Sequence, residues 1–347
     1  MKRVISLLMI VALAGVFSCK KDKQEVLGSS DAKAVLSNST NTLVNEMDGM
    51  QNTEGFQAIS NLEGVNAPFS NPMKSTVALL KTKSLKSLKS IQGNDFNFEE
   101  AKGEWEYNYE TDSVIKKSSS DKVIIWFPSD SNHKDVNDAK LTIYEYASQQ
   151  VIETDEWGYA DTSFMPTKLK ADVYISTKKV IDVSLTASYN SKGTPLSLNA
   201  TVSVDFYSIT ATFADAGTSQ SASVVLKKSD KVLVGAGVKL SYKDANKEEI
   251  SYIDGWVQLA DVKVQGNVNA GTMTNMQNPS AADINANVHL SIVRASDGAK
   301  VGDIKAFDEN GQAVPYIVFA DGTREKAETY VTDLSKKLDE LMNKKPV

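Results

Sequence analysis

From Phe96 onward, apolar and polar residues alternate with a period of two, the pattern of β-strands that bury one face and leave the other in water. The clearest alternating segments are residues 169–175, 181–189, 196–206 and 232–242. Short polar breaks such as Asn190–Pro195 separate them. Short connections join strands that lie side by side, so we expect a large antiparallel sheet, and the length of the strands favours a curved one.

Helical periodicity precedes and follows this region. Asp31 is a suitable cap for a first helix, and a second short helix carries Phe56, Ile59 and Leu62. Near the other end, apolar residues spaced three and four apart predict an amphipathic helix over 323–343, which Asp321-Gly322-Thr323 opens. The expected fold class is therefore α+β: a large curved antiparallel sheet, open and half-barrel-like, with N-terminal helices and a C-terminal amphipathic helix.

The same patterns divide the chain into four predicted regions. Residues 1–18 form a signal peptide, and residues 19–30 form a polar tether. Residues 31–92 form a helical N-terminal region. Residues 93–347 form the antiparallel sheet domain, which ends in the helix 323–343.

The leader has a basic start, an apolar run from Val4 to Phe17, and Ser18 directly before Cys19. The run of about 14 residues is shorter than the roughly 20 that a helix needs to cross the hydrocarbon core of a membrane. Val16-Phe17-Ser18-Cys19 resembles the lipobox of bacterial lipoproteins, although Phe17 departs from the small residue usual there. With the polar residues that follow, it is similar to the envelope lipoproteins of the Bacteroidetes phylum.

This resemblance implies that Cys19 is acylated and that the mature chain is anchored by lipid in the outer membrane. Several acyl chains on one cysteine give stable anchoring, where a single chain is marginal. The membrane is thus one expected partner. Whether the protein faces the periplasm or the cell surface stays open.

Composition excludes several functions. The 347 residues contain 38 Lys and Arg against 44 Asp and Glu, a net charge of −6. Loss of Lys2 and Arg3 with the leader leaves 36 against 44, or −8, which excludes a general polyanion binder, so no nucleic-acid partner is expected. One Cys and two His are too few for a disulfide framework or a Cys/His zinc site. We predict no cofactor, no metal site and no catalytic residue.

Three short motifs that could suggest a functional site are better explained as parts of the fold. The loop Asp130–Asp138 around His133 offers oxygen ligands, but it lacks the glycine and glutamate of an EF-hand and is typical of a turn. His289 alternates with Ser291, which places it on the solvent side of a strand. Val234–Val238 contains two glycines but not a phosphate-binding loop, and strand glycines indicate close packing or curvature.

Aromatic residues are dense between 105 and 164. Aromatic rings can form a platform for sugars or lipids, although most large rings in strands pack into a core. Trp157 and Tyr159 lie in a turn-like segment, so we predict that they are exposed and bind ligand. The nine residues of this group are Trp105, Tyr107, Tyr109, Trp126, Tyr144, Tyr146, Trp157, Tyr159 and Phe164.

The functional expectation is a non-enzymatic binding or scaffold protein, with a small apolar or lipid-like ligand or an envelope protein as partner. The expected fold is similar to the open half-barrels of periplasmic lipoprotein carriers, which shelter acyl chains. One alternative is a carbohydrate-active or other hydrolase with paired carboxylates among Asp155, Glu156 and Asp161. A second alternative is a structural subunit of an outer-membrane assembly.

Overall fold

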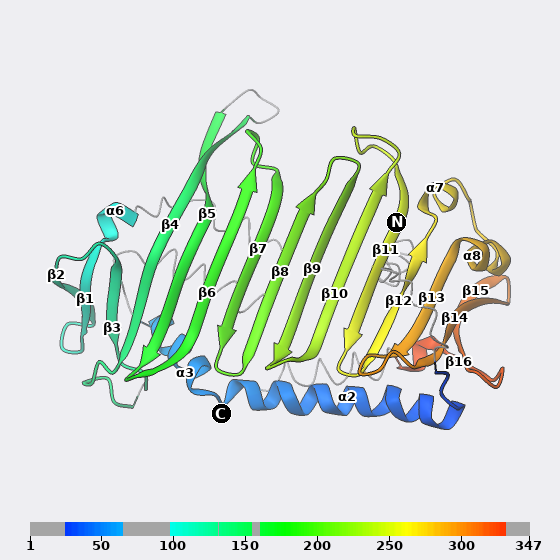
Figure 1. The fold of residues 1–347 in the computed structure, drawn as a ribbon, viewed down its shortest axis with the longest axis horizontal. Helices are drawn as coiled ribbons and strands as arrows, with labels where there is room; N and C mark the ends of the chain where they lie inside the picture. Colours follow the sequence, from blue (N-terminus) through cyan, green and yellow to red (C-terminus); the bar gives the residue numbers. More distant parts are fainter. Residues whose placement is uncertain (1–24, 65–97, 131, 155–159, 331–347) are drawn as a thin grey trace. The chain divides into compact units, whose positions relative to one another are not determined.

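The structure is a computed structural model that describes residues 25–64, 98–130, 132–154 and 160–330 (Figure 1). The chain divides into two compact units. We call residues 49–213 the middle unit and residues 1–48 with 214–347 the terminal unit. Strands dominate the described part of each unit.

In the middle unit, each strand from β3 onward lies beside its neighbour in sequence, in the order β2-β1-β3-β4-β5-β6-β7-β8. One pair departs from the expected antiparallel pattern, because β1 pairs in parallel with β3 as well as antiparallel with β2. The sheet is therefore mixed at this open edge. The elements are α3 (Glu54–Gly64), α6 (Phe98–Ala101), β1 (Gly103–Asn108), β2 (Ser113–Ser118), β3 (Val123–Phe127), β4 (Ala139–Thr154), β5 (Ala160–Ile175), β6 (Lys178–Tyr189), β7 (Pro195–Val204) and β8 (Tyr207–Asp215).

In the terminal unit, β9 to β16 also follow one another in sequence order, and their pairs are all antiparallel. The expected open, largely antiparallel sheet is thus confirmed, whereas its half-barrel curvature stays a prediction. The elements are α2 (Ser29–Gln51), β9 (Ser219–Lys228), β10 (Lys231–Tyr242), β11 (Ile250–Leu259), β12 (Val262–Val268), α7 (Ala270–Met273), α8 (Ala281–Asn287), β13 (Val288–Arg294), β14 (Lys300–Glu309), β15 (Gln312–Val318) and β16 (Arg324–Lys326).

Turn residues set the strand boundaries. Ser229 and Asn310 have positive φ angles of 53° and 50° in the turns that follow β9 and β14. The alternation over 196–206 stops earlier than expected: β7 ends at Val204, and Asp205 turns the chain with a φ of 51°. A second turn, at Ala260, separates β11 from β12.

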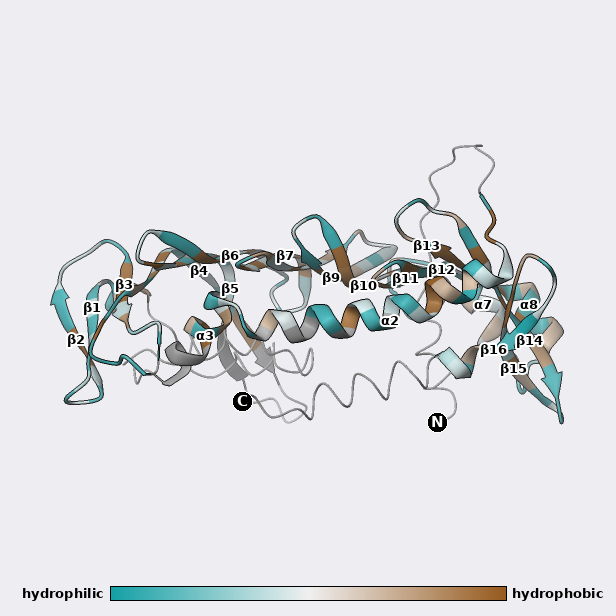
Figure 2. Cartoon of the chain, turned by 90° about the horizontal axis from the view of Figure 1, so that it is seen from below, coloured by the Kyte–Doolittle hydropathy of each residue, from teal (hydrophilic) through white to brown (hydrophobic). Residues whose placement is uncertain are grey.

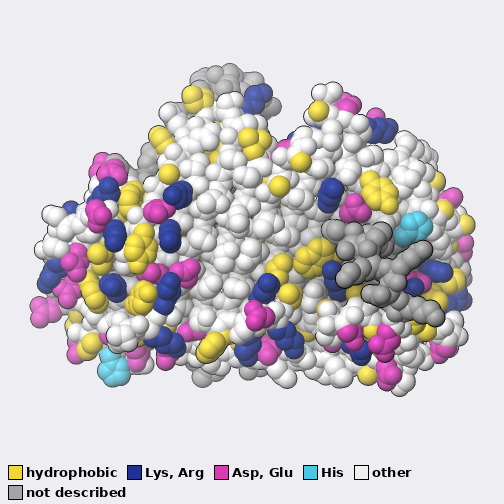
Figure 3. Space-filling view, in the orientation of Figure 1, with side chains coloured by type: hydrophobic (Ala, Val, Ile, Leu, Met, Phe, Trp, Pro, Cys, Tyr) yellow, Lys and Arg dark blue, Asp and Glu magenta, His cyan; other side chains and the backbone are white. Residues whose placement is uncertain are grey.

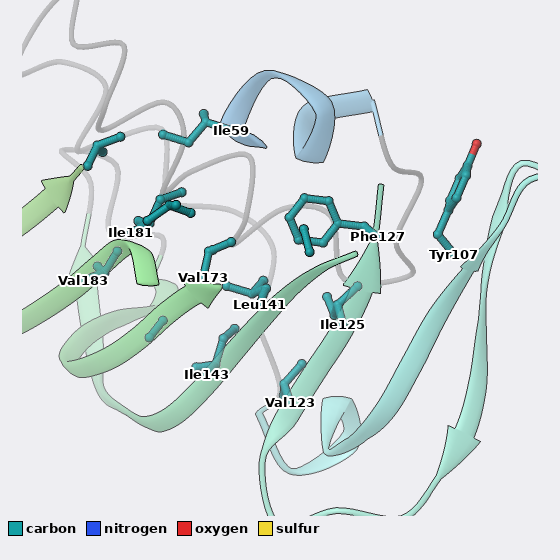
Figure 4. Close-up of a cluster of buried hydrophobic side chains, with 14 of the residues drawn as sticks. Ile59, Tyr107, Val123, Ile125, Phe127, Leu141, Ile143, Val173, Ile181 and Val183 are labelled. Carbon is teal, nitrogen blue, oxygen red and sulfur yellow. The ribbon is translucent and has the colours of Figure 1, made fainter. Parts of the chain in front are cut away.

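The core of the middle unit lies on one face of β3 to β6 (Figure 4). Val123, Ile125 and Phe127 alternate along β3 and are fully buried. Ile59 from α3 packs against the same cluster, as the predicted second helix requires. Burying each such side chain stabilises the fold by about 1.5–3 kcal/mol relative to leaving it exposed.

The terminal unit has its own core, in which α2 packs against β14 and β15. Ala32 and Leu36 on α2 pack with Val301 and Phe319. Figure 2 shows apolar and polar residues alternating along α2, as a helix with one buried side requires. Directly before α2, the Leu27 N–H donates to the Lys300 carbonyl at 2.8 Å and fixes the entry of the helix.

The predicted C-terminal helix does not begin where the periodicity places it. Arg324–Lys326 forms β16 and pairs with β15, because the edge of β15 offers backbone hydrogen bonds that the first turn of a helix lacks. Residues 327–330 are helical, and the part of the predicted helix from residue 331 onward lies outside the described residues. Among the described helices, none combines the length and the apolar character that a membrane span requires.

Candidate functional site

Three strands of the middle unit bring aromatic and lysine side chains together on the face opposite the core. The register places Trp126 of β3 opposite Lys140 of β4, and Lys140 opposite Tyr174 of β5. The Lys140 ammonium lies 5.5 Å from the ring centroid of Trp126 and 5.6 Å from that of Tyr174. Figure 3 shows hydrophobic, basic and acidic side chains interspersed over β1 to β5 at the left. We call Trp126, Lys140, Tyr144, Asp172 and Tyr174 the aromatic–lysine face.

Asp172 lies in the next row of this face and is 5% exposed. The Tyr144 hydroxyl donates a hydrogen bond to Asp172 Oδ2 at 2.7 Å. Burial and this hydrogen bond raise the pKa of Tyr144 to about 12, so its hydroxyl keeps the proton that it donates. Asp172 Oδ1 is buried and has no hydrogen-bond partner. A carboxylate in a dry site costs free energy when its oxygens are unpaired, so this oxygen lacks a donor that would stabilise it.

A second carboxylate stands directly opposite Asp172. The register pairs Asp172 of β5 with Asp182 of β6, and like charges at opposite positions destabilise a sheet. The Lys179 ammonium lies 2.8 Å from Asp182 Oδ1, and this hydrogen bond raises the pKa of Lys179. Each carboxylate therefore has its own donor, Tyr144 for Asp172 and Lys179 for Asp182.

Hydrogen bonds also fix the edge of the Trp126 ring. Its Nε1–H donates to Glu104 Oε1 at 2.7 Å, and the Ser118 hydroxyl donates to Glu104 Oε2 at 2.8 Å. These two hydrogen bonds lower the pKa of Glu104. Lys122 lies over the Tyr144 ring, with its ammonium 5.2 Å from the centroid. The rings are thus held in place before any ligand arrives.

Chemically, the aromatic–lysine face combines ring faces, ammonium donors and a carboxylate acceptor within adjoining rows. In the part of the chain that the structure describes, neither Lys122 nor Lys140 forms an ion pair with a carboxylate. Both ammonium groups instead lie on rings. Such a surface suits a ligand that offers flat C–H faces together with hydroxyl groups.

The described structure does not test the residues that were predicted from the sequence to bind ligand. Trp157 and Tyr159 lie outside the described residues, as do Asp155 and Glu156. Asp161 belongs to β5, but nothing is described of its side chain.

The dense aromatic group separates into two sets by strand parity. Tyr107 is buried and Trp105 packs against the core, whereas Trp126 and Tyr144 lie on the opposite face. Tyr174 joins them from β5, and sequence reasoning missed it. The signal was present, because Tyr174 occupies the position between the core residues Val173 and Ile175.

The two histidines do not form metal sites within the described residues. His133 Nδ1 lies 2.9 Å from Asp130 Oδ2 in the loop between β3 and β4. His289 is exposed on β13, on the face that it shares with Ser291, as the alternation predicted. No group of three His, Cys, Asp or Glu is placed to hold a metal ion in the described part of the chain.

Comparison with known proteins adds no assignment: no protein family, no curated protein and no solved structure matches the chain.

Proposed function

We propose that this protein is a non-enzymatic, lipid-anchored envelope protein that binds a glycan on its aromatic–lysine face. The observation that carries the proposal is the row Trp126–Lys140–Tyr174 beside the half-satisfied carboxylate of Asp172. The anchor follows from the resemblance of Val16–Cys19 to a lipobox. Cys19 itself lies outside the described residues.

A glycan fits this chemistry for two reasons. One face of a sugar ring carries C–H groups, which the negative face of an aromatic ring attracts. The sugar hydroxyls can accept from the Lys140 ammonium, and one that displaces the side chains over Asp172 can donate to its Oδ1. Cation–π contacts, worth about 0.5–1 kcal/mol each, are by themselves a structural reason for the rings and lysines to lie together on this face. They do not account for a buried carboxylate oxygen without a donor.

The chemistry of this face favours a glycan over the acyl chain considered from the sequence. An acyl chain needs a continuous apolar surface, and the apolar side chains of β3 to β6 are packed into the core cluster. On the opposite face, the rings alternate with Lys140, Asp172 and Asp182. A fatty acid would leave these charged groups without water or partners.

The test uses an array of neutral and acidic oligosaccharides, followed by calorimetry with the best binder. Replacing Trp126→Ala removes the stacking ring, and we expect the affinity to fall about tenfold, which corresponds to about 1.4 kcal/mol. Tyr109→Ala is the matched control, because Tyr109 is a 60% exposed ring outside this face. An unchanged affinity in Trp126→Ala, or the absence of any bound oligosaccharide, would contradict the proposal.

The same samples separate binding from hydrolysis. After prolonged incubation, chromatography should recover the oligosaccharide at its original length. Shorter products that disappear in an Asp172→Asn or Asp182→Asn variant would favour the hydrolase instead, because these two carboxylates stand opposite each other in the register.

A further inference from the structure

The terminal unit contains a second aromatic ring laid flat on its sheet. Trp256 of β11 stands opposite Gly237 of β10 in the register. A Cβ atom added at Gly237 would lie 2.5 Å from Trp256 Nε1, and one added at Gly235 would lie 2.7 Å from Trp256 Cζ3. Only glycine lets the indole approach the backbone this closely. One ring face therefore rests on β10, and the Lys263 ammonium lies over the ring.

Polar side chains continue the same face across β11, β12 and β13. The register places Gln265 opposite Trp256, and Asn267 opposite Asp254. His289 of β13 is the other neighbour of Asn267. Directly opposite residues of antiparallel strands share a face, so these side chains lie beside the indole. We call Trp256, Asp254, Gln265, Asn267 and His289 the Trp256 platform.

Asn267 is the unexpected member of this group. It is 9% exposed, and its Oδ1 atom is buried without a hydrogen-bond partner. An unpaired buried acceptor costs about 1–3 kcal/mol, so its presence beside an aromatic ring calls for an explanation. Burial also raises the pKa of the neighbouring Asp254 and lowers the pKa of Lys263, whose ammonium lies 5.1 Å from the Trp256 ring centroid. Polar and charged side chains beside the indole are thus partly removed from water.

We propose that the Trp256 platform is a second binding site, and that it holds one neutral hexose unit of a glycan. The C–H face of the sugar stacks on the indole once the flexible Lys263 side chain moves aside, and a hydroxyl that enters beside the ring donates to the buried Asn267 Oδ1. Gln265 and His289 supply further donors and acceptors. Asp254 stands opposite Lys239 in the register and Lys263 lies over the ring, so the charges beside the indole are of both signs. Only the class of ligand is shared with the proposed function, because every residue of the platform belongs to the terminal unit.

Calorimetry with the best neutral oligosaccharide from the array tests the proposal, using the full mature chain. Wild type should bind two equivalents. Trp256→Ala should bind one, at the aromatic–lysine face, and Gly237→Ala should do the same because its Cβ displaces the ring. The control is Val224→Ala, since Val224 is exposed on β9 and its register partner Ala236 alternates away from Gly237. A stoichiometry and affinity unchanged in Trp256→Ala would overturn the second site.

The two proposals fail in different ways. Loss of all binding in Trp126→Ala, with no effect of Trp256→Ala, would leave the proposed function standing and overturn the platform. Loss of all binding in Trp256→Ala, with no effect of Trp126→Ala, would do the reverse.

Asn267→Leu distinguishes a binding role from a structural one. We expect the affinity of the platform to fall about tenfold while the midpoint of thermal unfolding holds or rises, because leucine removes an unpartnered polar atom from a buried position. An intact affinity would overturn the assignment of the hydroxyl contact.

Discussion

At the residue scale, Gly266 allows β12 and β13 to approach each other more closely than a residue with a side chain would. It lies in the middle of β12 with a φ of 156°, and a Cβ atom there would lie 1.8 Å from the His289 carbonyl oxygen on β13. The obstacle is backbone, which cannot turn aside as a side chain can. We expect Gly266→Ala to lower the free energy of unfolding by about 2–4 kcal/mol, as measured by urea denaturation.

The matched control is Gly298→Ala. Gly298 also has a positive φ, of 75°, but nothing lies within 4 Å of an added Cβ. Gly298→Ala should lower the free energy of unfolding by only about 1 kcal/mol, the cost of a left-handed backbone in a residue with a side chain. Equal losses in the two variants would show that crowding between β12 and β13 is not what requires glycine at 266.

At the scale of elements, Asp215 is the last residue of β8 and lies inside the terminal unit, where it holds the loop between β10 and β11. Its carboxylate pairs with the Lys247 ammonium and accepts hydrogen bonds from Gln220 Nε2 and the Gly217 N–H, each at 3.0 Å. These contacts, with Lys247 the largest, lower the pKa of Asp215 from 3.8 to about 2. The folded state therefore favours the ionised carboxylate more than the unfolded chain does.

The sign of the pH dependence follows from this shift. The contribution of Asp215 to stability is fully present above about pH 4 and is lost as the pH falls towards 2. In urea titrations from pH 5 to pH 2, wild type should lose more stability than Asp215→Asn, in which no charge is available to protonate. Parallel pH profiles for the two proteins would rule out a stabilising role for this ion pair.

At the scale of the whole molecule, the proposed anchor and the fold should be separable. Cys19 precedes a polar tether in the sequence and lies outside every segment with strand or helix periodicity. We expect Cys19→Ala to abolish incorporation of a fatty-acid probe and to yield either a soluble protein or an unprocessed precursor. The urea unfolding curve of the purified domain should stay the same, because no packing residue changes.

Wild type provides the decisive comparison. Incorporation of the probe into wild type and its absence from Cys19→Ala would support acylation at this residue. A wild-type protein that takes up no label and fractionates as soluble would contradict the lipobox, and with it the proposed place in the outer membrane.

Local sequence was sufficient for much of the architecture. Alternation over 181–189 and 232–242 predicted β6 and β10, and the polar break Asn190–Pro195 predicted the connection between β6 and β7. These features depend on residues two to four apart, whose conformations are set by side-chain alternation and by the φ angles that turns need. The two glycines of Val234–Val238 were also interpreted correctly as a sign of close packing.

Other features required the fold. The parallel pairing of β1 with β3 and the pairing of β16 with β15 depend on which backbone edges meet, and periodicity does not encode this. The neighbours Trp126 and Tyr174 are 48 positions apart, and the register of β3, β4 and β5 alone brings them together. A shift of one residue in either pairing would move one of the rings to the core face. Alternation along a single strand specifies its two faces, but only pairing across strands decides which side chains become a site.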